Sequence, residues 1–181
     1  MEDNKKCIKL LKEQLAMAHE VLEGTIEGTG EDHAHFQKIG TALPVGAAYG
    51  HAVFSEDGFA SMLGKTQPLF MSEYKDKTGF SEPMPGPSDD WSKQHADWSK
   101  KVKVDLAKAR TYAKAVYAAT DKYLDTLTDD NLTDEIDFSS WGMGKKPLSW
   151  ALSMVVIGHI NNLAGEISAI KGVQGLKGYP F

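Results

Sequence analysis

The sequence contains very little cysteine and no long uninterrupted apolar run. Its one cysteine, Cys7, excludes an intramolecular disulfide and a zinc site built from several thiolates. The most apolar stretch, Leu148–Ile160, is shorter than the ~20 residues that a helix needs to cross a bilayer. The N-terminal segment opens acidic with no apolar run after it, unlike a secretory signal. These absences predict a soluble, cytoplasmic protein with no membrane partner.

The sequence also lacks a cluster of basic residues. The chain has 20 Lys and Arg residues against 25 Asp and Glu, a formal net charge of −5, and the basic residues are spread along the chain. A nucleic-acid surface needs clustered cations, so no nucleic-acid partner is expected. The sequence also lacks a phosphate-binding glycine loop, a Ser-His-Asp arrangement and an interpretable pair of carboxylates. The sequence therefore does not predict a nucleotide-binding glycine-loop enzyme, a Ser-His-Asp hydrolase or an enzyme that uses a pair of carboxylates.

Four segments repeat apolar residues at the spacing of three and four that is typical of amphipathic helices. The first stripe is Ile8, Leu11, Leu15, Ala18, Leu22 and Ile26. The second is Val45, Ala48, Ala52, Ser55, Phe59 and Met62. The third is Val102, Leu106, Ala109, Ala113, Val116, Thr120, Tyr123 and Leu127. The fourth is Leu152, Val155, His159, Leu163, Glu166 and Ile170.

Four amphipathic helices that bury one another predict an all-α four-helix bundle, in one domain spanning residues 1–181. No sustained alternation of period two competes with this, and β-rich pieces such as Glu135–Phe138 are very short. The third helix is expected to begin at Ser88 or Asp89 and to run to about Thr128, with a bend or a separate first turn near Trp91–Trp98. Long loops, residues 64–88 and 129–146, follow the second and third helices, and loops of that length are usually functional.

Three segments resemble motifs of one known family. Residues 44–57 (PVGAAYGHAVFSED) look like the second-helix segment of the DinB-like (DinB/YfiT) superfamily, and residues 158–167 (GHINNLAGEI) look like its last-helix motif. Residues 171–181 (KGVQGLKGYPF) resemble the closing segment of one subgroup. Together these segments extend the resemblance over nearly the whole chain. It implies a four-helix bundle, a homodimer, and a metal-dependent enzyme such as a hydrolase or a thiol-linked transferase.

The resemblance also implies a metal site. The family site uses one histidine from the second helix and an H-x-x-x-H pair from the last, because residues i and i+4 lie one turn apart on the same helical face. Carried over, His51 and His159 match the first two ligands of a divalent metal such as nickel, zinc or iron. Leu163 occupies the third position, where this sequence departs from the pattern.

That departure leaves a second hypothesis open. With Leu163 in place of a ligand, the site gains apolar surface, and an ion-free pocket could bind a small molecule with His51 and His159 as its polar anchors. The protein would then be a non-catalytic, dimeric binding or stress-associated module whose metal site has decayed.

Other polar residues are weaker candidates on spacing. Glu56 and Asp57 are turned away from His51 on their helix, and Asn162 offers an amide oxygen that imidazole-preferring metals bind weakly. Glu166 lies ~10 Å along the helix from His159, which suits a salt bridge better than a shared ion. The remaining predictions are a structural His19, a solvated turn at His33 and His35, and a buried or half-buried, inert Cys7.

Overall fold

A computed structural model describes residues 4–37 and 40–181 of the chain. The helices are α1 (Lys6–Ile26), α2 (Glu31–Ala34), α3 (Val45–Gly64), α4 (Trp91–Lys101), α5 (Leu106–Asp125), α6 (Leu148–Trp150) and α7 (His159–Val173). A π-helical segment, η5 (Ala151–Gly158), joins α6 to α7, and short 3-10 turns occur at Leu69–Met71, Asp129–Thr133 and Ser139–Trp141. The strands are β1 (Glu135–Asp137) and β2 (Lys145–Pro147).

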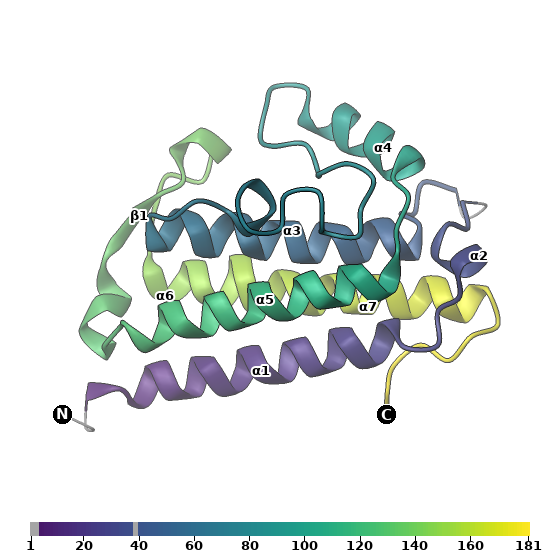
Figure 1. Cartoon of the computed structure of the whole chain (residues 1–181). Coiled ribbons are helices and arrows are strands. Elements are labelled where there is room, and N and C mark those ends of the chain that lie inside the picture. The colour runs from purple at the N-terminus through teal and green to yellow at the C-terminus, as the bar shows by residue number, and fades with distance from the viewer. Residues whose placement is uncertain (1–3, 38–39) are drawn as a thin grey trace.

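Four long helical segments lie side by side: α1, α3, α5 and the run from α6 to α7 (Figure 1). α7 packs against α1 and α3, and α5 packs mainly against α3. All six residues of the predicted first stripe are buried in α1, as helical spacing requires. Leu163 is one of the apolar residues of the shared core, with 3% of its surface exposed.

The predicted third helix is two helices. α4 ends at Lys101 and α5 begins at Leu106, so the break lies C-terminal to Trp91–Trp98, where a bend was expected. At the break Val104 forms an antiparallel bridge with Phe80, and the Asp105 side chain accepts the Lys108 amide as the N-cap of α5. This capping bond starts a new helix, and α4 lies outside the packed helices, over α3 (Figure 1).

The fourth predicted stripe is only partly correct. Leu152, Leu163 and Ile170 are buried, but Val155 and His159 are half-buried and Glu166 is exposed. The reason is η5, because i→i+5 hydrogen bonds change the number of residues per turn and so shift the helical phase. A stripe predicted with ~3.6 residues per turn therefore does not stay on one face of the helix across this segment.

The loop between α5 and α6 contains a small sheet that the all-α prediction missed. β1 and β2 pair antiparallel, with Ile136 opposite Lys146. Each strand has only three residues, too few for a pattern of period two to emerge from the sequence.

Buried polar groups attach the loops to the helical core. The carboxylate of Asp57, 2% exposed, accepts hydrogen bonds from the Leu69 and Phe70 amides and from the Tyr112 hydroxyl. Nζ of Lys171 donates to the carbonyls of Thr25 and Glu27, each at 2.6 Å, and so binds the carbonyl end of α1. These bonds fix the loop after α3 and the end of α1 to elements distant in sequence.

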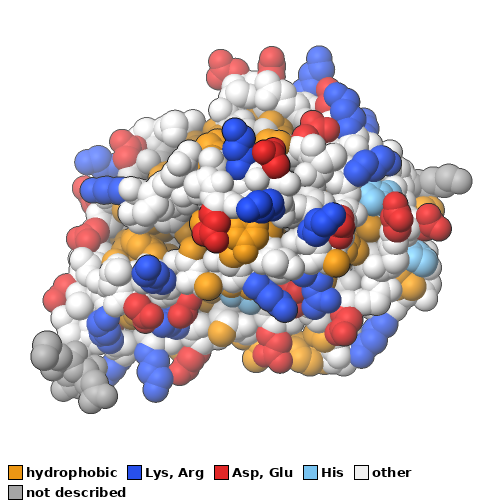
Figure 2. Space-filling view, in the orientation of Figure 1, with side chains coloured by type: hydrophobic (Ala, Val, Ile, Leu, Met, Phe, Trp, Pro, Cys, Tyr) orange, Lys and Arg blue, Asp and Glu red, His pale blue; other side chains and the backbone are white. Residues whose placement is uncertain are grey.

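The surface agrees with the dispersed charge of the sequence. On the face shown in Figure 2, basic and acidic side chains are interspersed, and neither sign forms a large block. Within residues 4–37 and 40–181, no helix combines the length and the apolar character needed to cross a bilayer.

Candidate functional site

Three imidazole rings from three different helices meet beside α3. The ring centroid of His51, on α3, lies 4.8 Å from that of His159, at the start of α7. It lies 4.5 Å from that of His95, on α4. The two histidines predicted as ligands are therefore brought together, and a third that the sequence analysis did not select joins them. We call His51, His95 and His159 the histidine cluster.

The cluster favours uncharged imidazole. Burial, followed by the electrostatic influence of His159 and then of His95, lowers the pKa of His51 to about 3. Burial lowers the pKa of His95, and burial together with the effect of His95 lowers that of His159. Neutral imidazole is the form that binds metal ions, because it carries a free lone pair on one ring nitrogen.

Two nitrogen atoms of the cluster are unusual. Nδ1 of His51 and Nε2 of His95 are buried, and neither has a hydrogen-bond partner among the described residues. Leaving a buried polar atom unpaired costs roughly 1–3 kcal/mol, so native proteins keep few of them. A pair of such atoms on rings in contact is what a site for an electrophilic ligand would present.

Glycines on α3 let the chain that carries His95 approach closely. A Cβ built at Gly50 would lie 2.6 Å from Cε1 of Phe80, and one at Gly46 would lie 3.0 Å from Cγ2 of Val104. Phe80 and Val104 are the bridged pair at the end of α4. Gly46 and Gly50 are one turn apart, so together they seat this pair against α3 next to His51.

Two tryptophans flank His95 on the inner face of α4. The Trp91 ring stacks on the His95 ring at 4.8 Å between centroids, and its own centroid lies 6.0 Å from that of His51. Trp98, 4% exposed, donates from Nε1 to the carbonyl of Glu82. Both tryptophans therefore pack against neighbouring parts of the protein.

The sequence did carry a signal for His95. Trp91, His95, Trp98 and Val102 follow one another at spacings of four, three and four, which is one face of a helix. Because His95 lies on an otherwise apolar face, that spacing predicts that the ring is buried. The spacing does not predict which helix the ring contacts, because α4 belongs to the long connection between α3 and α5, whose path is not set by local sequence.

The cluster is not a closed coordination shell as it stands. Within the described part of the chain, no three His, Cys, Asp or Glu side chains are arranged so that they could hold one metal ion. Leu163 lies in the apolar core, so the third family position contributes packing and no donor.

The carboxylates near His51 in sequence are engaged elsewhere. Glu56, 2% exposed, is bonded through both carboxylate oxygens to Nε2 of His19, at 2.9 and 3.0 Å, and the His19 ring stacks on Tyr117. Asp57 binds the loop after α3, as described above. His19 thus faces inward, as its spacing allows, and it pairs with a residue that had been placed on the far face of its helix.

Three further predictions need correction or placement. Cys7 is exposed, and not buried as predicted, because it precedes the first inward position of α1, Ile8. His35 is not merely solvated: its Nδ1 donates to the Glu31 carbonyl and its Nε2 accepts the Val104 amide. Asn162 is exposed, like Glu166.

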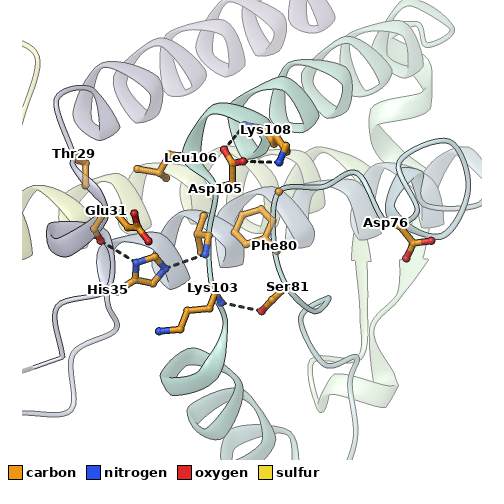
Figure 3. Close-up of a pocket in the computed structure, with 12 residues that line it drawn as sticks. Thr29, Glu31, His35, Asp76, Phe80, Ser81, Lys103, Asp105, Leu106 and Lys108 are labelled. Carbon is orange, nitrogen blue, oxygen red and sulfur yellow. Dashed lines mark hydrogen bonds and ion pairs between the residues drawn. The ribbon is translucent and has the colours of Figure 1, made fainter.

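A cavity at the junction of α2 and α5 is separate from the histidine cluster. It has a volume of about 660 Å³, and none of the three histidines is among its lining residues. Figure 3 shows the His35 ring between the Glu31 carbonyl and the Val104 amide, and Asp105 paired with Lys108. The cavity joins α2, the Phe80 segment and the start of α5, and its chemistry is that of a structural junction.

Comparison with known proteins places the chain in a family. The sequence model of the DinB superfamily matches residues 14–163, a range that contains the whole histidine cluster. The chain belongs to the DinB superfamily. A solved structure, described as that of a conserved protein from Enterococcus faecalis, is 24% identical and superposes with a TM-score of 0.76 over 92% of this chain and 96% of that chain. At this identity the likeness concerns the fold. No curated protein matches this DinB superfamily chain.

Proposed function

We propose that this DinB superfamily protein is a metal-dependent enzyme in which His51 and His159 bind a divalent ion such as nickel, zinc or iron. The observation that carries the proposal is the contact between their rings, at 4.8 Å between centroids, in surroundings that favour the neutral form of both. Helices α3 and α7 pack directly against each other, so both donors come from rigid elements.

The donor chemistry fits such an ion. Imidazole nitrogen suits zinc, nickel and iron, and the buried Nδ1 of His51 is a nitrogen without a hydrogen-bond partner among the described residues. A bound divalent ion would supply Lewis acidity and lower the pKa of a coordinated water or thiol. The chain's own contribution is to hold two neutral rings in place and to shield them, since Trp91 covers His51 from the side of α4.

The reaction class that follows is hydrolysis or thiol-linked transfer. Both need an activated oxygen or sulfur nucleophile beside open coordination positions, and two protein ligands leave several positions open. We further propose that α1, α3, α5 and the α6–α7 run form the four-helix bundle that the resemblance implies, as one domain, and that the protein is a homodimer.

A second candidate function is favoured by one specific observation. Among the described residues no three His, Cys, Asp or Glu side chains are arranged to hold one ion as they stand, and Leu163 keeps the family's third position apolar. A non-catalytic module would use His51 and His159 as polar anchors for a small molecule, without a metal.

Metal content separates the two candidates. The full-length protein, purified without chelators, is analysed for bound elements together with His159→Ala and with His33→Ala, a half-buried histidine of α2 outside the histidine cluster, as the control. One equivalent of nickel, zinc or iron that His159→Ala loses and His33→Ala keeps supports the metal-dependent enzyme. Absence of metal, together with no binding of added Zn²⁺ or Ni²⁺ by calorimetry, overturns it in favour of the module.

A further inference from the structure

We propose that His95, carried by α4, is the third protein ligand of the bound metal and takes over the role that Leu163 cannot fill. This inference rests on the proposed metal site at His51 and His159. It assigns a ligand to the long connection between α3 and α5, outside the helix pair from which the family pattern draws its ligands.

The His95 ring and the His159 ring each lie close enough to the His51 ring to share an ion with it. Metal–nitrogen bonds to imidazole are ~2.0–2.1 Å, so the ring centres of two histidines on one ion lie within about 6.5 Å of each other. The centroid distances from His51, 4.5 Å to His95 and 4.8 Å to His159, are both inside this limit. Coordination by all three rings requires a change of side-chain rotamer, because no three such side chains of the described residues are arranged to hold one ion as they stand.

The environment of His95 fits a ligand better than a packing residue. The side chain is 7% exposed, and its Nε2 is buried without a hydrogen-bond partner among the described residues. A leucine or phenylalanine there would pack equally well between Trp91 and Trp98 without an unpaired polar atom. A bound ion would accept the lone pair of this nitrogen and remove the cost of burying it.

The segment that carries His95 is held firmly enough to position a donor. Trp98 bonds to the Glu82 carbonyl and packs near Phe54, while Phe80 and Val104 lie against the glycines of α3. A helix that is held by packing limits the adjustment needed for coordination to the His95 side chain. α4 therefore presents His95 from a fixed helix.

Other polar clusters do not offer a competing donor. Glu23 accepts hydrogen bonds from the hydroxyls of Tyr49 and Tyr117 and from Arg110, and Glu56 is bonded to His19. Among histidines, His35 uses both ring nitrogens in bonds to the backbone. His95 is therefore the candidate for a third ligand: its ring contacts that of His51, and it comes from α4 and not from α7.

The test measures coordination directly and does not depend on activity. Zn²⁺ is titrated into the metal-free, full-length protein while long-range ¹H–¹⁵N spectra follow each imidazole ring. We expect the ring nitrogens of His51, His159 and His95 to shift together at one equivalent. A spectrum in which only the His51 and His159 signals shift overturns the assignment of His95 and leaves the proposed metal site intact. If none of the three shifts, both proposals are wrong.

Variants give an independent measurement. His95→Ala is expected to weaken Zn²⁺ and Co²⁺ binding at least about tenfold and to alter the visible absorption of the Co²⁺ complex, because one nitrogen donor is lost. His33→Ala is the control and should leave both unchanged. Thermal unfolding of the metal-free variants shows whether His95→Ala is folded. If it is folded and binds both ions with wild-type affinity and spectrum, His95 is not a ligand.

Discussion

The rings of His51 and His159 meet at 4.8 Å between centroids and an interplanar angle of 65°, although one lies in α3 and the other begins α7. At this distance protonation of one ring disfavours protonation of the other, in addition to the cost of burying either charge. The contact therefore connects the candidate site to the stability of the fold.

The first prediction concerns acid stability of the metal-free protein. Burial, with the effects of His159 and His95, lowers the pKa of His51 to about 3, whereas an unfolded histidine titrates near ~6.5. Between these values the unfolded chain binds a proton that the folded chain does not. Stability should therefore be fully present above pH ~6.5 and fall as the pH drops toward 3, by up to ~1.4 kcal/mol per pH unit from His51 alone.

Urea unfolding at several pH values in the presence of chelator measures this slope. His51→Gln removes the titrating ring while keeping a polar side chain, so its stability should fall less steeply with acid. Parallel curves for the two proteins would show that His51 does not titrate in this way.

The second prediction uses the position where the family ligand is missing. Leu163→His creates an i, i+4 pair with His159, and we expect it to raise divalent-metal affinity at least about tenfold, or ~1.4 kcal/mol. In the His95→Ala background the gain should be larger, because the new ring then replaces a donor and does not merely add one. Calorimetry of the four proteins in this double-mutant cycle gives the coupling between the two positions.

Because Leu163 is buried, its replacement by histidine also costs folding stability, so each protein's thermal unfolding is recorded beside its affinity. Equal gains in both backgrounds would mean that positions 95 and 163 act independently of each other.

The third prediction tests the close packing of the segment that carries His95 against α3. In Gly50→Ala the new Cβ would lie 2.6 Å from the Phe80 ring, so Phe80 and the adjoining end of α4 must move away from α3. We expect metal affinity to fall severalfold although no ligand is changed. Gly58→Ala, on the same helix with no atom within 4 Å of the new Cβ, is the control. Its affinity should be unchanged, and helix propensity should stabilise it by up to ~1 kcal/mol.

The fourth prediction concerns the buried amine of Lys171. Lys171→Met keeps most of the aliphatic chain but removes two hydrogen bonds to the carbonyl end of α1. Hydrogen bonds to charged groups contribute ~1.5–3 kcal/mol, so we expect a loss of about 2–3 kcal/mol in chemical denaturation. Hydrogen exchange should rise first in the last turn of α1. Lys114→Met, at an exposed position of α5, should change stability by less than ~0.5 kcal/mol.

The parts of the fold that follow an unbroken period were predictable from the sequence. In α1, the six stripe positions from Ile8 to Ile26 follow one another at steps of three or four, and all six are buried. The meeting of His51 with His159 was expected only through the family resemblance, since periodicity places each ring on a face but does not pair the faces.

The remainder depended on contacts between distant segments. The break between α4 and α5 is fixed by the bridge of Val104 to Phe80, and the course of α4 over α3 by the glycines at positions 46 and 50. Such contacts leave no local periodic signal. His95 was therefore visible as an inward residue of a short helix and invisible as a neighbour of His51.

The π-helical segment before His159 has a consequence for comparing this protein with its relatives. The eight residues Ala151–Gly158 hydrogen-bond with the wider i→i+5 spacing, so facing positions on either side of the segment are out of step by about one residue. An ungapped alignment with a relative whose last helix is α-helical throughout will match core residues of one protein to surface residues of the other. In such an alignment, a single-residue gap ahead of His159 keeps both the packing upstream and the imidazole downstream in equivalent positions.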